Sequence, residues 1–99
     1  MLYTLSIASA AEDDIRKTFL WYETQKGGLG GRFQEAVAQA VVSIQSNPLK
    51  TQIRYGNTRV FFLEKFPYGI HFQVDSNNQH ILLIALFHTA RNMPSWMHQ

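Results

Sequence analysis

The feature that most constrains the fold is a run of seven consecutive apolar residues near the carboxyl end, residues 81–87 (ILLIALF). A strand with no polar face has both sides covered, so it belongs inside a sheet rather than at its edge. Polar side chains follow the run at once, at His88, Thr89 and Arg91. The sequence therefore predicts a buried strand over residues 80–88 that delivers polar groups to the rim of a sheet.

Two further strand patterns precede this run. Residues 58–63 place Arg59, Phe61 and Leu63 on one strand face and Val60 and Phe62 on the other. Residues 68–74 alternate apolar and polar side chains, and a Phe-Pro pair separates the two stretches. Residues 75–78 (DSNN) have the composition of a tight hairpin turn. These strands and the apolar run predict an antiparallel meander, and the polar residues 49–57 before it are interpreted as a loop.

The amino-terminal half predicts one strand and two helices. Residues 2–7 alternate as a strand does, and Ser9 with Glu12 has the spacing of a capping box at a helix start. The first helix should end at the Lys-Gly-Gly of residues 26–28, and the second should run from residue 29 to 46, before an Asn-Pro pair. Because the link between the helices is short, they should form an antiparallel hairpin.

The element order predicts a single α+β domain over residues 1–99, with the order β-α-α-β-β-β. We expect a mostly antiparallel four-stranded sheet, in which the first strand covers the free side of the buried strand and the helical hairpin packs on one face. A chain of 99 residues without cysteine has room for one core and excludes disulfides and thiolate metal sites. No apolar run approaches the ~18 residues that span a bilayer, so we expect a cytoplasmic protein without membrane contact.

The net charge of +2 is unevenly distributed. Residues 1–46 hold four basic and five acidic groups, whereas residues 47–99 hold five basic and two acidic groups. The sheet half is therefore the basic half, and an acidic protein or nucleic acid would prefer it. A solvated surface with a chance imbalance is the alternative.

Candidate chemistry centres on the end of the buried strand. His88 has the side chain of a general acid or base, or it supports the turn that follows. Arg91 suits a phosphate or a partner's carboxylate, or it anchors the tail, and Trp96 is expected to pack that tail on the sheet. The glycine-rich residues 27–31 either cradle a phosphate at a helix start or allow close backbone contact. The histidines lack metal-ligand spacing, so neither a metal nor another cofactor is expected.

The ordered set of motifs resembles the RelE/ParE toxin superfamily over nearly the whole chain. The resemblance is carried by Trp21-Tyr22-Glu23, Gly28-Leu29-Gly30 with Phe33, Asn47-Pro48, Phe66-Pro67-Tyr68, Phe87-His88, Arg91, and Pro94 with Trp96. It implies the toxin of a bacterial type II toxin–antitoxin, or plasmid stabilisation, module. It also implies the β-α-α-β-β-β fold that the periodicity predicts independently.

The resemblance implies two possible activities. RelE-like members cut mRNA on the ribosome with basic residues and a late tyrosine; here Arg59 and Arg91 match basic positions, and Arg54 or Lys50 would add a third charge. ParE-like members inhibit DNA gyrase and carry no catalytic site. No tyrosine follows Arg91, and the hairpin motifs favour the ParE branch.

We therefore expect a gyrase inhibitor that a cognate antitoxin neutralises in a hetero-oligomer. The alternatives are a ribosome-dependent mRNA endoribonuclease carried by Arg59, His88 and Arg91, and a non-toxic binding module that retains the fold. The expected target- or partner-binding residues are Arg54, Arg59, His71, His88, Arg91 and Trp96.

Overall fold

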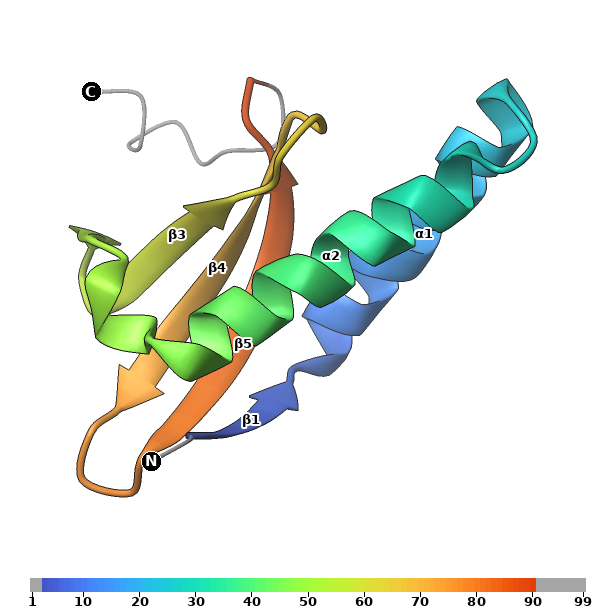
Figure 1. Cartoon of the computed structure of the whole chain (residues 1–99). Coiled ribbons are helices and arrows are strands. Elements are labelled where there is room, and N and C mark those ends of the chain that lie inside the picture. Colours follow the sequence, from blue (N-terminus) through green and yellow to red (C-terminus); the bar gives the residue numbers. More distant parts are fainter. Residues whose placement is uncertain (1–2, 91–99) are drawn as a thin grey trace.

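The computed structural model describes residues 3–90 and consists of a mixed five-stranded sheet with a helical hairpin on one face (Figure 1). The strand order is β1-β5-β4-β3-β2, with β1 parallel to β5 and the other pairs antiparallel. The α+β class and the element order are as predicted, and the sheet has one strand more than predicted. The elements are β1 (Thr4–Ile7), α1 (Ser9–Gln25), α2 (Leu29–Ser46), the 3-10 helix η1 (Pro48–Lys50), β2 (Ile53–Tyr55), β3 (Thr58–Phe62), β4 (Tyr68–Asp75) and β5 (His80–His88).

Strand β5 lies inside the sheet, between β1 and β4, which confirms its predicted position. Only the face toward the helices is fully covered: Ile81, Leu83 and Leu86 are buried there, whereas Leu82 on the other face is 36% exposed. The pairing with β4 shifts at Ile84, which has no partner in the register. Because of this bulge, Leu83 and Leu86 both point toward the helices although they are three residues apart.

Residues 49–57 were predicted to be a loop, and this prediction is wrong in part. They include most of η1 and the edge strand β2. Ile53 pairs with Arg59 and Tyr55 pairs with Thr58 across a tight turn, with a register shift between the two pairs. Gly56 in that turn has φ +49°, a left-handed conformation that glycine adopts readily. A three-residue strand with an irregular register shows no alternation that sequence analysis could detect.

The predicted capping box does not form. The N-cap of α1 is Ala8, which provides no side-chain hydrogen bond, and Ser9 is already helical. The backbone N–H of Ala8 donates to the carbonyl of Leu83 at 2.8 Å, so the ladder from β1 to β5 continues up to the first residue before the helix. Because pairing with the sheet fixes the backbone up to Ala8, the helix starts one residue earlier than the Ser9–Glu12 pattern predicts.

The core lies between the hairpin and the sheet. Phe33 and Ile44 of α2 are fully buried against Phe72, Ile81 and Leu83 of the sheet. Residues that pair across β3, β4 and β5 share a face, so the register separates the helix-facing side from what we call the open face. The open face carries Thr58, Val60, Phe62, Gly69, His71, Gln73, Leu82, Ala85 and Phe87.

Candidate functional site

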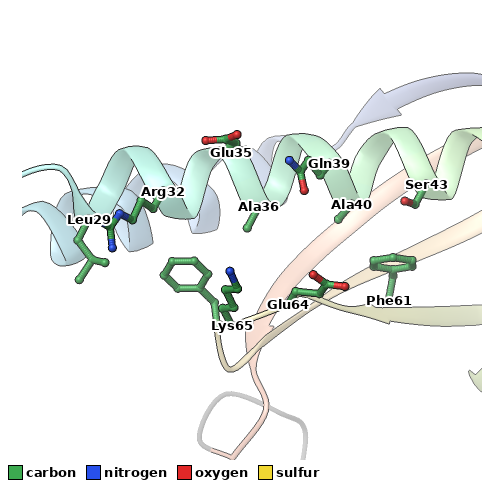
Figure 2. A pocket seen from close by; sticks show the side chains of 11 residues that line it. Leu29, Arg32, Glu35, Ala36, Gln39, Ala40, Ser43, Phe61, Glu64 and Lys65 are labelled. Carbon is green, nitrogen blue, oxygen red and sulfur yellow. The ribbon is translucent and has the colours of Figure 1, made fainter.

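A cavity of about 580 Å³ opens between α2 and the segment that runs from β3 into the β3–β4 connection (Figure 2). Ala36 and Ala40, one turn apart on α2, leave room beside the helix, and Phe61 faces them because it pairs with the core residue Ile70. We call this cavity the α2–β3 groove. It is lined by Leu29, Arg32, Glu35, Ala36, Gln39, Ala40, Ser43, Phe61, Glu64, Lys65 and Phe66.

Four charged side chains line the α2–β3 groove: Arg32, Glu35, Glu64 and Lys65. No ion pair joins any of them to another residue within 3–90, where the ion pairs are those of Asp13 with Arg16 and Lys17 on α1. Lys65 has φ +69°, which is unusual for a residue with a Cβ. The groove therefore combines an apolar floor with two cationic and two anionic side chains that form no ion pair with any described residue.

His71 lies on the open face but has no exposed surface. Its Nδ1 and the Tyr55 hydroxyl are 2.6 Å apart and share a hydrogen bond, and its ring meets the Phe87 ring edge to face at 4.8 Å. Its Nε2 is buried without a hydrogen-bond partner among the described residues. Burial lowers the pKa of His71 from 6.5 to about 4, so the ring is neutral at pH 7. The prediction that His71 contacts a target does not fit this enclosed position.

Arg54 is exposed at the edge of the sheet, with its guanidinium 5.3 Å from the centroid of the Phe62 ring. Phe62 is itself 43% exposed and belongs to the open face. A guanidinium stacked on an aromatic ring is held in place yet keeps its charge accessible. The predicted role of Arg54 in partner binding is compatible with this position.

Arg59 and His88 take part in the fold at two different places. Arg59 donates hydrogen bonds to the carbonyls of Thr51 and Leu49, so it fastens the segment around η1 to β3. His88 Nδ1 accepts a hydrogen bond from the N–H of Ala90 at 3.0 Å, which is the turn-supporting role named among the alternatives.

Arg59 and His88 are also well separated. Arg59 pairs with Phe72 and His88 with Tyr68, four residues apart along β4, or about 13 Å. The structure therefore does not bring these two candidate catalytic residues together. Arg91 and Trp96 lie outside the described residues.

The glycine-rich turn between the helices holds a carboxylate of the chain itself. Glu23 of α1 accepts hydrogen bonds from the N–H of Gly30 at 2.7 Å and, more weakly, of Gly28 at 3.4 Å. A Cβ on Gly30 would lie 2.5 Å from Glu23 Cγ and 2.7 Å from the carbonyl oxygen of Phe19. Of the two roles predicted for the glycine-rich residues, close backbone contact is therefore correct. The Glu23 carboxylate occupies the helix start at which a phosphate would have to bind.

Sequence analysis did not identify the α2–β3 groove. Its cations come from two segments far apart in the chain, and the orientation of Lys65 depends on a left-handed backbone that the sequence does not signal. Within residues 3–90, no three histidine, aspartate or glutamate side chains are placed to hold a metal ion. None of the described helices combines the length and apolar character that crossing a bilayer requires.

Comparisons with known proteins place the chain in a family. The family model described as the ParE toxin of the type II toxin–antitoxin system parDE matches residues 5–93. No curated protein matches the chain in sequence.

Solved structures of toxin–antitoxin proteins share the fold. A chain of the chromosomal ParDE system from P. aeruginosa aligns with a TM-score of 0.74 at 17% identity, covering 85% of this chain and 92% of that one. A chain of the intact E. coli RelBE complex aligns with a TM-score of 0.65 at 18% identity, covering 85% and 93%. The isolated E. coli RelE toxin aligns with a TM-score of 0.67 at 18% identity, covering 90% and 86%. Because the family model covers nearly the whole chain and the fold agrees with it, this chain belongs to the ParE toxins of type II toxin–antitoxin systems, within the RelE/ParE superfamily.

Proposed function

We propose that this toxin acts in the cytoplasm by inhibiting DNA gyrase and that a cognate antitoxin neutralises it. The proposal is supported by the match to ParE toxins over residues 5–93. The likeness to the P. aeruginosa ParDE structure is one of fold and gives no information on the target. The choice between a gyrase inhibitor and a nuclease therefore depends on the side chains of this chain.

The observation that carries the proposal is the separation of Arg59 and His88, the two candidate catalytic residues that the structure describes. Cleavage of RNA by 2′-OH attack needs a base near the attacking oxygen and cations near the phosphate, all around one reacting centre. Here the Arg59 guanidinium is engaged by backbone carbonyls, and His88 lies on the other side of β4 and about 13 Å further along the strand direction. The third candidate, Arg91, lies outside the described residues. Such an arrangement favours a protein that acts by binding over one that acts on a phosphodiester.

The surface also suits a partner protein. Large apolar side chains are exposed within the η1–β2 segment, at Leu49 and Ile53, and on the open face, at Phe62 and Leu82. A second chain that covers such surface gains hydrophobic free energy, and an extended or helical antitoxin segment has the right shape. The toxin–antitoxin complexes among the structural relatives support this part of the proposal.

The test is a gyrase supercoiling assay with the purified chain, run in parallel with a ribosome-dependent mRNA cleavage assay. We expect loss of supercoiling and intact mRNA, with supercoiling restored when the antitoxin is added. Cleaved mRNA with unchanged supercoiling would establish the endoribonuclease alternative. The absence of growth arrest on expression without antitoxin would favour a non-toxic binding module. Arg59→Ala and Arg91→Ala add a check on the endoribonuclease alternative, because a nuclease that depends on these residues should lose mRNA cleavage in both variants.

A further inference from the structure

We propose that the toxin contacts its target protein through the β2 edge and that the target contributes an extended segment with an acidic side chain. The β2 edge is the outermost strand of the described sheet together with the exposed side chains around it: Leu49, Lys50, Ile53, Arg54 and Phe62. This inference rests on the proposed inhibition of DNA gyrase and adds the face of the toxin and the chemistry of the contact. Three features carry it: a strand with a free side, a cation fixed on an exposed aromatic ring, and a local excess of basic residues.

Strand β2 offers one side to a partner. Among the described strands it pairs with β3 alone, at the opposite end of the sheet from β1 (Figure 1). The backbone groups on the outer side of an edge strand are a template for a strand from another chain. Apolar side chains accompany this edge, because Leu49 is 50% exposed and Ile53 is 49% exposed. An extended segment alongside β2 would remove both from water.

The cation of the β2 edge is positioned by an exposed ring. Phe62 is 43% exposed, and the Arg54 guanidinium lies 5.3 Å from the centroid of its ring. The ring in turn lies against the backbone of β4, since Phe62 pairs with Gly69 and a Cβ added to this glycine would lie 3.3 Å from Phe62 Cδ1. Because the guanidinium is held on the ring before a partner arrives, less side-chain freedom is lost when it binds a carboxylate.

The charge of this region favours an acidic partner. Residues 36–63 contain three basic residues, Lys50, Arg54 and Arg59, and no acidic residue. Arg59 is engaged by two backbone carbonyls, so the exposed Lys50 and Arg54 supply the accessible charge. A nucleic-acid surface draws its affinity from many phosphate contacts, whereas this edge combines two exposed cations with exposed aliphatic side chains. Such a combination suits a protein segment that alternates acidic and apolar side chains.

Calorimetry with purified DNA gyrase in the absence of DNA measures the contact. Arg54→Gln should weaken binding roughly tenfold, as loss of a charge-assisted contact does, and Arg54→Glu should weaken it further. Lys26→Gln is the matched control, because it removes the same charge from an exposed residue at the end of α1 and should leave the affinity unchanged. Added salt should weaken binding of the wild type more than binding of Arg54→Gln. Because Arg54 is exposed, both variants should keep the melting temperature of the wild type.

A matched apolar pair gives the second arm. Ile53 on β2 and Leu20 on α1 are both large, apolar and about half exposed, at 49% and 52%. Ile53→Gln should weaken binding to gyrase several-fold, whereas Leu20→Gln should not. Unchanged affinity in both Arg54→Glu and Ile53→Gln would overturn the inference while the proposed function stands, and weakened binding of Leu20→Gln would then place the contact on α1.

Two further outcomes would also overturn the inference. A parallel titration with a single-stranded oligonucleotide tests the nucleic-acid alternative. If Arg54→Gln weakens binding of the oligonucleotide but not of gyrase, the β2 edge is a nucleic-acid surface. If the wild-type toxin itself does not bind gyrase, the proposed function fails, and this inference fails with it.

Discussion

The contact between Glu23 and Gly30 predicts opposite effects for the same substitution at two adjacent glycines. Both glycines lie in the first turn of α2, where alanine is favoured over glycine by up to about 1 kcal/mol. At Gly31 a Cβ meets nothing within 4 Å, so Gly31→Ala should stabilise the fold by a few tenths to about 1 kcal/mol. At Gly30 the new methyl group would approach Glu23 Cγ to 2.5 Å and a backbone oxygen to 2.7 Å.

The cost of Gly30→Ala has two parts. Overpacking a site that cannot relax costs about 1–3 kcal/mol, and the backbone oxygen of Phe19 is held by its helix. Displacing the Glu23 carboxylate removes an acceptor from the start of α2, which costs about 0.5–2 kcal/mol. After subtracting the helix propensity gain, we expect Gly30→Ala to lower the free energy of unfolding by about 2–3 kcal/mol, and the melting temperature by about 10–20 °C.

Urea unfolding followed by circular dichroism measures both variants against the wild type. A double-mutant cycle with Glu23→Ala separates the two parts, because the cost of Gly30→Ala should shrink once the Glu23 side chain is absent. Equal effects of Gly30→Ala and Gly31→Ala would refute the steric argument. Strict additivity with Glu23→Ala would show that Glu23 does not contribute to the cost.

Three further predictions follow from the described contacts. His71 has a pKa of about 4 in the folded protein and of 6.5 in the unfolded chain, so the unfolded chain binds the proton first as the pH falls. The free energy of unfolding should therefore decrease by about 3 kcal/mol between pH 6.5 and pH 4. The urea midpoint of His71→Phe should change less over this range, and an equal change would contradict the assignment. Arg59→Ala should lower the free energy of unfolding by about 1–2 kcal/mol because two backbone carbonyls lose their donor, whereas Arg54→Ala on the exposed edge should change it by less than about 0.5 kcal/mol. Millimolar phosphate should raise the melting temperature no more than chloride of equal ionic strength, because a carboxylate already occupies the start of α2.

The elements that sequence analysis predicted well are those whose pattern is long. The apolar run predicted the full length of β5, and the apolar spacing of residues 29–46 together with the Asn-Pro pair that follows predicted α2. Strand β2 was missed because it has three residues and pairs irregularly. The capping box was predicted wrongly because a local pattern was overridden by the pairing of Ala8 with β5, a contact between residues far apart in the chain.

The site was predicted less well than the fold because residue type alone does not give accessibility. Arg59 and His71 have side chains suited to recognition, yet the structure uses them to fasten a loop and to fill the sheet. Sequence analysis did not predict a role for Arg32 or Lys65, since neither belongs to a motif. They become a candidate binding pair only because α2 lies beside the β3–β4 connection in the folded protein.

The same reasoning separates what the family motifs indicate about fold from what they indicate about function. Glu23 and Gly30, one from each hairpin motif, contact one another and hold α1 against the start of α2. Such residues preserve the hairpin whatever the toxin binds, so a shared hairpin motif is evidence of common architecture rather than of a common target. The target must be recognised by accessible side chains. The bound antitoxin either leaves these side chains accessible or covers them. If the antitoxin covers Phe62, as proposed above, it also reaches Arg54 beside that ring, and neutralisation would act by direct competition for this edge of the sheet.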